Sequence, residues 1–344
     1  MKKYLIPKDG NFYKANLHMH TTVSDGRMTP EEVKEEYKKR GYSVVAYTDH
    51  EALVPHTELT DDTFLAITSY EVATNNNITP DDFRFMKTYH MNLYSKDPNK
   101  DVSPVFNMAL LWIEKVAQYM SDEAKAVDWP REYTNESINA LITRAKEDGF
   151  LVSLCHPNWS LQNYPDYSEL KGFWGIECYN TGCVRGGYPD TMQPIDDLLH
   201  LGEKVFPVAA DDAHGSKEDP NDCFGGFVMI KAGRLDYDTI MEALEKGDFY
   251  ASSGPSIEEL YLEDDVLHIK TSPAVKIEVI TERRIRRCIH GEGMTEAAFD
   301  LGDYLTKSRR FSGKHWPSYF RVNVYDAAGE QAHTRAFFEE DWDK

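Results

Sequence analysis

Residues 15–50, ANLHMHTTVSDGRMTPEEVKEEYKKRGYSVVAYTDH, contain the pattern that decides the fold. A short apolar run lies near each end of this stretch, and strong helix signals lie between the two runs. Thr29 suits a helix N-cap, Pro30 suits the first helical position, and Glu32 completes a capping box. Gly41 is placed to end the helix. The stretch therefore predicts a strand, a helix and a second strand in succession.

The same alternation continues through the first three-quarters of the chain. Further β-like apolar runs occur at residues 65–67, 151–154, 175–176 and 205–210. Helical patterns occupy about residues 135–148 and 237–246, and a glycine closes each of them. Alternation of this kind predicts an α/β domain with a mainly parallel sheet.

Two segments depart from this alternation. Residues 75–133 open with three asparagines and carry an aromatic and methionine-rich helical stretch at residues 106–120. We expect an insertion over one end of the core, where it would shape substrate access. From residue 254 onward, apolar residues recur mostly at period two, which predicts strands. The chain is therefore expected to consist of a larger domain, residues 1–253, and a small all-β sandwich domain, residues 254–344.

Charge and composition limit the classes of partner. The chain has 344 residues and a formal net charge of −20, which argues against a broad nucleic-acid or anionic membrane surface. A small anionic substrate remains compatible, because bound metal ions reverse the sign of the charge locally. Five cysteines without a CxxC pair, and no signal-peptide pattern, favour the cytoplasm. A secreted or periplasmic location would require that a leader had been removed, and the oligomeric state stays open.

Histidine and acidic side chains collect where the predicted strands end. Six of the twelve histidines lie in short polar segments beside an apolar run: His18, His20, His50, His90, His156 and His214. The acidic residues in the same segments are Asp25, Asp49, Glu71, Glu177 and Asp212. The carboxyl ends of strands in an α/β barrel converge on one face, so groups far apart in sequence meet there.

The spacing of these groups indicates metal binding. Residues i and i+2 of a strand point the same way, so His18 and His20 can hold one ion, and Asp212 and His214 repeat the spacing. Asp25 lies in a turn sequence that can fold its carboxylate back toward the histidines. The neighbouring Asp49 and Asp211 are each expected to orient a histidine or to cap a helix.

Imidazole and carboxylate together suit Zn, Mn or Fe. The ligands are too many for one ion, so two or three divalent ions are expected, and a carboxylate such as Glu71 could bridge two of them. Closely spaced ions activate a water and leave a net positive site, which favours an anionic substrate. No GxSxG motif, catalytic-cysteine pattern or P-loop is present in the sequence.

In order along the chain, these motifs resemble those of the PHP (polymerase and histidinol phosphatase) superfamily. The matching motifs, spread over residues 12–253, are His18-x-His20-x4-Asp25-Gly26, Thr48-Asp49-His50, Glu71, His90, His156-Pro157 and Asp212-x-His214. The resemblance implies a distorted (β/α)7 TIM-like barrel with a trinuclear metal site at the carboxyl ends of its strands. It also implies phosphoester hydrolysis, with a metal-bound hydroxide as the nucleophile.

The resemblance implies three ligand sets. One metal would be held by His18, His20, Glu71 and Asp212. A second would be held by Glu71, His90 and His156, and a third by Asp25, His50 and His214. Of these nine ligands, five are the predicted catalytic residues: Asp25, His50, Glu71, Asp212 and His214.

Substrate residues and substrate class are less constrained. Arg185, on a loop after a site strand, is a candidate phosphate clamp, and Glu177 and Asn180 are candidate substrate contacts. The leading hypothesis is a phosphoesterase for a small phosphorylated metabolite or nucleotide. The C-terminal part is similar to two-domain PHP proteins of the carbaryl-hydrolase-like branch, which raises a carboxylic ester, carbamate or amide as the alternative substrate. A third hypothesis is a non-catalytic protein that binds through its β domain.

Overall fold

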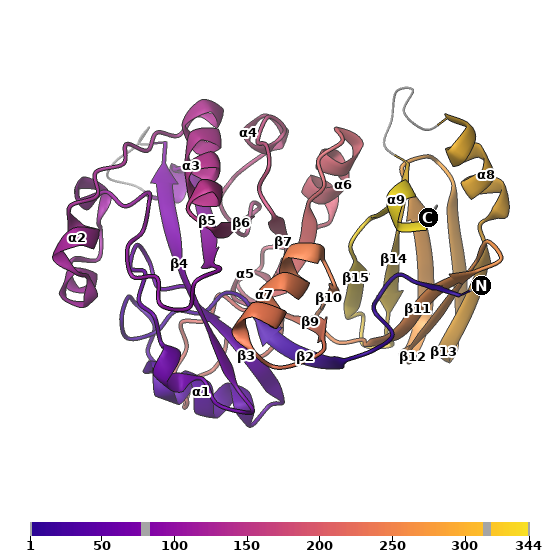
Figure 1. Ribbon diagram of the computed structural model, residues 1–344, viewed down its shortest axis with the longest axis horizontal. Coiled ribbons are helices and arrows are strands. Elements are labelled where there is room, and N and C mark those ends of the chain that lie inside the picture. Colours follow the sequence, from indigo (N-terminus) through magenta and orange to yellow (C-terminus); the bar gives the residue numbers. More distant parts are fainter. Residues whose placement is uncertain (1, 77–82, 312–317, 343–344) are drawn as a thin grey trace.

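The computed structural model describes residues 2–76, 83–311 and 318–342. These residues form a mixed α/β protein with one large hydrogen-bonded sheet. Figure 1 shows the strands and helices of the α/β part on one side and the C-terminal strands on the other. No helix among the described residues is long and apolar enough to cross a membrane.

The strands of the α/β part follow the predicted alternation. They are β2 (Asn11–Asn16), β3 (Tyr42–Tyr47), β4 (Leu65–Asn75), β5 (Thr88–Ser95), β6 (Phe150–Leu154), β7 (Gly175–Asn180), β8 (Phe206–Ala210), β9 (Phe227–Ala232) and β10 (Phe249–Ser252). The pairs β2–β3, β3–β4, β6–β7 and β7–β8 are parallel. β5 runs antiparallel to both β4 and β6, and β9 runs antiparallel to β2. The β9–β10 pair is antiparallel as well. The α/β part therefore has a mixed sheet, and the prediction of a mainly parallel sheet is wrong, because β5 and β9 run against their neighbours.

Helices follow most of these strands. The α-helices are α1 (Pro30–Lys38), α2 (Asp122–Lys125), α3 (Asn135–Glu147), α4 (Tyr164–Tyr167), α5 (Thr181–Arg185), α6 (Gln193–His200) and α7 (Tyr237–Lys246). The 3₁₀ helices are η1 (Thr57–Leu59), η2 (Phe83–Phe85), η3 (Met108–Leu110) and η4 (Glu114–Tyr119). α1 packs on β3, α3 on β6 and α7 on β9.

The helix-boundary signals are confirmed. At the start of α1, the Thr29 hydroxyl accepts from the backbone of Glu32 at 3.2 Å, and the Glu32 carboxylate accepts from the backbone of Thr29 at 3.0 Å. α7 ends at Gly247, whose φ of 75° is the left-handed conformation that glycine adopts at low cost.

The segment predicted as an insertion is only partly one. Residues 88–95 form β5, which lies between β4 and β6 in the sheet. The predicted helix at residues 106–120 is instead two 3₁₀ helices, η3 and η4, joined by extended residues. Residues 77–82, with Asn77 of the triple asparagine, lie outside the described residues. Of the described residues in this segment, 83–87 and 96–133 therefore lie outside the strands of the sheet.

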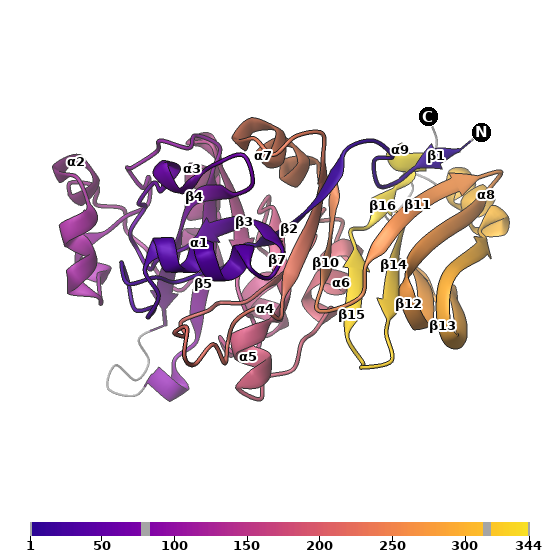
Figure 2. The same cartoon turned by 90° about the horizontal axis from the view of Figure 1, so that it is seen from below.

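The C-terminal part is built of antiparallel strands. Its elements are β1 (Lys3–Tyr4), β11 (Ile257–Glu263), β12 (Val266–Thr281), β13 (Arg286–Asp300), α8 (Gly302–Phe311), β14 (Tyr319–Tyr325), β15 (Gln331–Thr334), β16 (Phe337–Phe338) and α9 (Glu339–Trp342). Figure 2 shows the N-terminal strand β1 beside β11, with which it pairs. β10 pairs with both β9 and β15, so the sheet runs from one part into the other. The two-layer sandwich stays a prediction.

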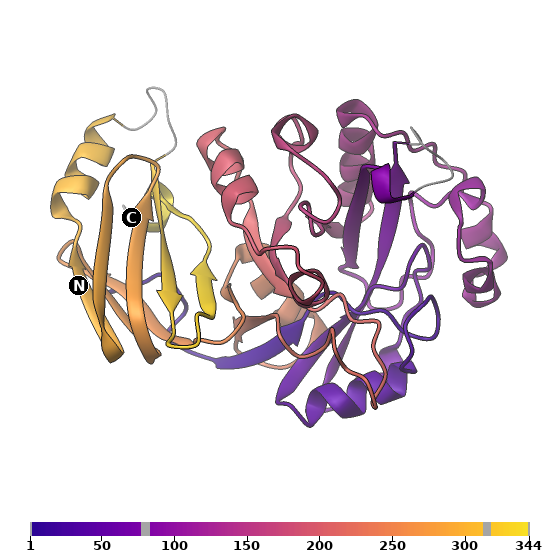
Figure 3. The same ribbon diagram turned by 180° about the vertical axis from the view of Figure 1, so that it is seen from behind.

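The two parts also meet through side chains. Figure 3 shows α6 next to the C-terminal strands. From β14, the guanidinium of Arg321 donates to both carboxylate oxygens of Asp196 on α6, at 2.9 and 2.8 Å. Paired N–H···O bonds of this kind fix the relative orientation of the two groups.

The site end of the sheet brings β2 and β8 together. Beyond β2 and β8, the Asp212 backbone N–H donates to the His18 carbonyl at 2.9 Å, and the His20 N–H donates to the Ala213 carbonyl at 3.1 Å. Met19 and Ala213 form a parallel bridge between these two bonds. β2 and β8, the first and last strands of the series β2 to β8, thus meet at their carboxyl ends. Hydrogen-bonded strand neighbours otherwise form an open series, so the closed (β/α)7 barrel stays a prediction.

One buried histidine in the C-terminal part predicts an acid-dependent loss of stability. His333 on β15 is buried, and burial followed by the charge of Arg321 lowers its pKa to about 3. Because the unfolded pKa is about 6.5, protonation favours the unfolded chain as pH falls below that value. Between pH 7 and pH 5, this residue should remove about 2 kcal/mol from the free energy of unfolding.

Urea unfolding of the wild type and of His333→Gln at the two pH values measures this contribution. The wild type should lose about 2 kcal/mol more than the variant between pH 7 and pH 5. Equal losses in the two proteins would contradict the assignment. Because the comparison is between two pH values, any constant cost of the substitution cancels.

Candidate metal centre

His18 and His20 lie in the short extended segment that follows β2, and both side chains reach the site. Asn16 holds this turn, because its amide donates to the His18 carbonyl at 3.0 Å and its oxygen accepts from the His18 N–H at 3.3 Å. Both imidazoles are fully buried, and their Nε2 atoms lie 3.2 Å apart. The predicted i, i+2 arrangement therefore brings the Nε2 atom of one ring next to the Nε2 atom of the other.

Asp25 lies on a loop that Asp49 holds in place. The Asp49 carboxylate accepts from the backbone and hydroxyl of Thr21, both at 2.8 Å, and from the backbone and hydroxyl of Ser24 at 3.0 and 2.7 Å. A Cβ at Gly26 would lie 2.3 Å from the His20 carbonyl oxygen, so glycine is needed there. Asp49 thus shapes the loop of Asp25; the expected roles, orienting a histidine or capping a helix, are not what the structure shows.

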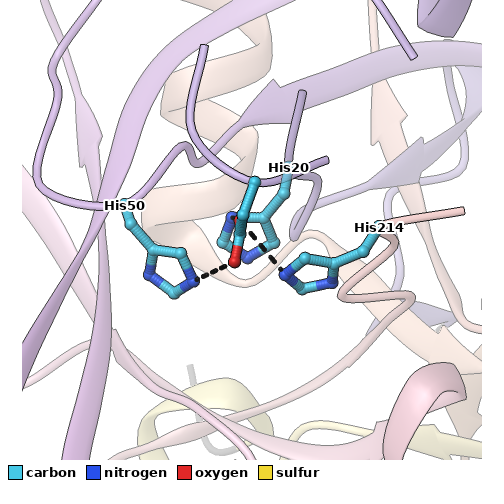
Figure 4. Close-up of side chains that lie close together, drawn as sticks. His20, His50 and His214 are labelled. Carbon is cyan, nitrogen blue, oxygen red and sulfur yellow. Dashed lines mark ion pairs between the residues drawn. The ribbon is translucent and has the colours of Figure 1, made fainter. Parts of the chain in front are cut away.

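Asp25 faces three histidine rings. Figure 4 shows the rings of His20, His50 and His214 turned toward one another. Asp25 oxygens lie 3.8 Å from His20 Nδ1, 3.7 Å from His50 Nε2 and 3.4 Å from His214 Nε2. The predicted third ligand set is brought together, with His20 as an additional neighbour.

Glu71 lies at the centre of the site, fully buried. Its Oε1 lies 2.9 Å from His90 Nδ1, 3.4 Å from His156 Nε2 and 3.5 Å from His18 Nε2. Its Oε2 lies 2.9 Å from His50 Nδ1 and 3.5 Å from His20 Nε2. The two oxygens of one carboxylate therefore face two different groups of histidines.

Asp212 and His214 follow β8 on a strained turn. Asp212 Oδ1 lies 3.2 Å from His18 Nε2 and 3.1 Å from His20 Nε2, and Oδ2 lies 3.6 Å from His156 Nε2. Asp212 has a φ of 56° and His156 a φ of 28°, values that cost non-glycine residues about 1 kcal/mol or more each. Packing around the site stabilises both conformations, which aim the two side chains inward.

The six histidines together with Asp25, Glu71 and Asp212 are called the cluster below. Asp211 lies outside the cluster, although it is adjacent to Asp212. It accepts hydrogen bonds from the Tyr37 and Thr181 hydroxyls and from the backbone N–H groups of residues 224–226. Like Asp49, it fixes a loop, here the one that leads into β9.

Glu177 and Asn180 contact candidate ligands on the side away from the centre of the site. Glu177 Oε1 lies 2.7 Å from His18 Nδ1, which leaves His18 Nε2 facing the cluster. Its Oε2 accepts from the His156 N–H at 2.9 Å and from the Asn180 amide at 3.0 Å, and that amide also lies 3.2 Å from Asp212. A carboxylate bonded to the far nitrogen of a ligating imidazole fixes its tautomer and orientation.

The exposed Arg185 lies near the cluster, but its guanidinium donates hydrogen bonds to backbone carbonyls. Its Nη1 donates to the carbonyls of Asn221 and Cys223 at 2.7 and 3.1 Å. It lines a cavity of about 530 Å³ that also reaches Asp212 and His214. A neighbouring cavity of about 460 Å³, which contacts more of the cluster, is lined by Arg84 instead.

The pKa shifts keep the carboxylates ionised. Burial opposes ionisation of Glu71 and Asp212, but the surrounding histidines hold both pKa values well below their usual range. The same balance lowers the pKa of Asp25. Burial, then the charges of His214 and His50, lowers the pKa of His20 to about 4, so His20 is a neutral donor.

The donor set fits divalent ions. Within the described part of the chain, the buried His20 Nδ1 has no hydrogen-bond partner, and the buried His50 Nδ1 and Glu71 Oε2 lie 2.9 Å apart with no other partner. Several sets of ligand atoms lie within 4.8 Å of one another, among them His18 with His20 and Asp212, and His50 with Glu71 and His90. Buried imidazole nitrogens and carboxylate oxygens that converge in this way suit Zn, Mn or Fe.

Some residues at the site were not singled out in the sequence. Trp112 and Trp159 line the 460 Å³ cavity, and Ser160 Oγ lies 3.1 Å from His156 Nδ1. Glu51, next to His50, forms a buried ion pair with Arg131. The adjacency of Glu51 to His50 and of Trp159 to His156 was a usable signal; no short-range pattern marks Trp112 or Arg131.

No family model and no curated protein matches the chain. Among solved structures, one from Bacteroides vulgatus, named as a two-domain protein containing a predicted PHP-like metal-dependent phosphoesterase, is 15% identical with a TM-score of 0.45, covering 97% of this chain and 98% of that one. A structure from Bifidobacterium adolescentis, named as a metal-dependent phosphoesterase, is 17% identical with a TM-score of 0.39, covering 70% and 96%. An amidohydrolase from Chromobacterium violaceum, with bound sulfate and no metal, is 14% identical with a TM-score of 0.39, covering 68% and 96%.

Proposed function

We propose that this chain is a metal-dependent phosphoesterase with a di- or trinuclear centre. The observation that carries the proposal is the placement of Glu71. One of its oxygens faces His18, His90 and His156, and the other faces His20 and His50. A carboxylate shared in this way suits a bridge between two ions a few ångströms apart.

Divalent ions bound there would lower the pKa of a coordinated water and stabilise negative charge on the substrate. The chain's own residues hold and orient this centre. Glu177 fixes the ring of His18, Ser160 contacts that of His156, and the Asp212 carbonyl lies 3.0 Å from His214 Nδ1. These contacts leave the opposite nitrogen of each ring for the centre.

Charge favours an anionic substrate. The cluster contains three carboxylates, Asp25, Glu71 and Asp212, whereas two divalent ions carry four positive charges and three carry six. The surplus suits a small phosphorylated metabolite or nucleotide despite the acidic chain. We also propose that β2 to β8 form a distorted (β/α)7 barrel around the centre, which the backbone contacts between residues 18–20 and 212–213 support.

Chelation followed by reconstitution tests the function. The purified full chain is stripped of metal, reloaded with Zn, Mn or Fe, and assayed with p-nitrophenyl phosphate, bis(p-nitrophenyl) phosphate and p-nitrophenyl acetate. We expect two or three ions per chain and phosphoester turnover that falls by about 100-fold or more on chelation and returns with at least one metal.

The substrate panel separates the competing functions. Turnover of the acetate alone would overturn the phosphoesterase and favour a carboxylic ester, carbamate or amide hydrolase with the same centre. No turnover of any substrate under every metal would favour a binding protein. Metal content, measured by inductively coupled plasma mass spectrometry, shows whether the centre was loaded in each case.

A further inference from the structure

The cavity over the metal centre has two kinds of wall. Ligand residues such as His50, His90 and Asp212 form one part of its lining. Large apolar and aromatic side chains form another: Met86, Trp112, Trp159, Leu161 and Tyr188. A cavity of about 460 Å³ accommodates a small molecule, since ligand pockets typically measure about 300–1,000 Å³.

Trp112 stands on the His50 side of this cavity. Its ring packs edge-on against His50, with centroids 4.9 Å apart at 61°, yet 55% of the residue is exposed. The segment that carries it is held in place: the buried Val116 packs against Val23 and Ala52, on the loops of Asp25 and His50. Lys115 Nζ also donates to the Thr22 carbonyl at 3.0 Å. Trp112 is therefore exposed but anchored to the loops that carry metal ligands.

Trp159 stands on the side of His90 and His156. Its ring centroid lies 5.0 Å from that of His156 and 5.6 Å from that of His90, and 37% of the residue is exposed. It lies inside a tight turn, in which the Ser160 N–H donates to the His156 carbonyl at 3.1 Å. A residue between a ligand and its supporting serine has little freedom to move away from the centre.

Two anchored, exposed indoles beside a buried polar cluster are unusual for a surface that contacts only water. Tryptophan gains from burial against another flat apolar group, and aromatic pairs gain more than their buried area alone explains. The positive surplus of the loaded centre supplies the complementary site for a negative group. The lining therefore matches a ligand with an anionic end and a flat ring next to it.

We propose that Trp112 and Trp159 determine specificity by holding a planar aromatic or heteroaromatic ring attached directly to the scissile group of the substrate. This inference rests on the proposed hydrolytic function and names its substrate class. The ring lies between the His50 side and the His90–His156 side of the cavity, while the anionic group lies on the metal centre.

Binding of non-hydrolysable phosphonates tests the proposal without requiring turnover. Phenylphosphonate and propylphosphonate are titrated into the metal-loaded full chain by calorimetry, with tryptophan fluorescence as a second readout. We expect phenylphosphonate to bind about 10-fold more tightly than propylphosphonate and to quench the fluorescence. Equal affinity of the two phosphonates would overturn the inference.

Variants assign the preference to the two rings. Trp112→Ala and Trp159→Ala should each reduce the preference for phenylphosphonate to about threefold or less, with the affinity for propylphosphonate changed less than about twofold. Trp112→Phe and Trp159→Phe, which keep an aromatic ring and protect the fold, should retain most of it. Tyr119→Ala is the matched control, because Tyr119 is 44% exposed in the same segment but does not line the cavity. A preference that survives both alanine variants would overturn the assignment.

The outcomes keep the two proposals apart. If phenylphosphonate is preferred but no phosphoester is hydrolysed, the substrate class stands and the phosphoesterase fails. If phosphoesters are hydrolysed in a metal-dependent way but neither tryptophan affects the preference, the phosphoesterase stands and the specificity inference fails.

Discussion

Replacing Glu71 with glutamine is expected to lower kcat by about 10³-fold or more and to remove at least one metal ion per chain. Glutamine keeps the shape of the side chain but removes the charge, and its amide nitrogen cannot act as a ligand. Because the two oxygens of Glu71 face separate histidine groups, the substitution weakens both sides of the centre at once. Steady-state kinetics and mass-spectrometric metal analysis of the purified variant measure the two effects.

Two further variants control this experiment. Glu71→Asp keeps the charge but shortens the side chain, so an intermediate loss of activity is expected. Glu136→Gln removes an exposed carboxylate at the start of α3 and should leave kcat and metal content unchanged. Full metal content together with activity within about threefold of wild type in Glu71→Gln would contradict the bridging role.

Replacing Arg131 with methionine is expected to lower the free energy of unfolding by about 3–5 kcal/mol. Arg131 Nη2 donates to both oxygens of Glu51, at 3.0 and 2.9 Å, and the two side chains are 0% and 1% exposed. Burial raises the pKa of Glu51 even beside Arg131, so the carboxylate left alone would be strongly destabilising. Denaturant unfolding of the metal-loaded protein measures the loss.

The double variant Glu51→Gln/Arg131→Met separates the charge from the packing. Removing both charges should recover a large part of the loss, because no unpaired charge then remains buried. Lys171→Met breaks the exposed pair with Glu203, whose side chains are 56% and 22% exposed, and should cost less than about 1 kcal/mol. A cost this small for Arg131→Met as well would contradict the expected role of the buried pair.

Arg131 also connects two parts of the site. It lies in the segment after β5 that carries Trp112, whereas Glu51 follows the candidate ligand His50 and has a φ of 60°. The backbone of Glu51 donates to the Glu71 carbonyl at 2.7 Å. Loss of the ion pair is therefore expected to disturb the positions of both His50 and Trp112.

Much of the local structure could be predicted from sequence. The capping box at Thr29 and the glycine after α7 are interactions within a few residues, so their signals are complete in the sequence. The strand β5 was missed because its antiparallel placement between β4 and β6 depends on partners far along the chain. The 3₁₀ helices of residues 106–120 were read as one helix because both forms share similar apolar spacing.

The sequence by itself determined which residue types end the strands, and in which order. That alone was sufficient to predict a site of histidines and carboxylates, since strand ends in an α/β fold meet on one face. Only the tertiary structure decided what each group does. It placed the two oxygens of Glu71 toward different histidines. It also showed that Asp49 and Asp211 accept hydrogen bonds that hold loops, and that Glu177 contacts the far nitrogen of His18. The physical reason is that spacing along a strand fixes the direction of a side chain, whereas its contacts depend on segments that only the folded chain brings together.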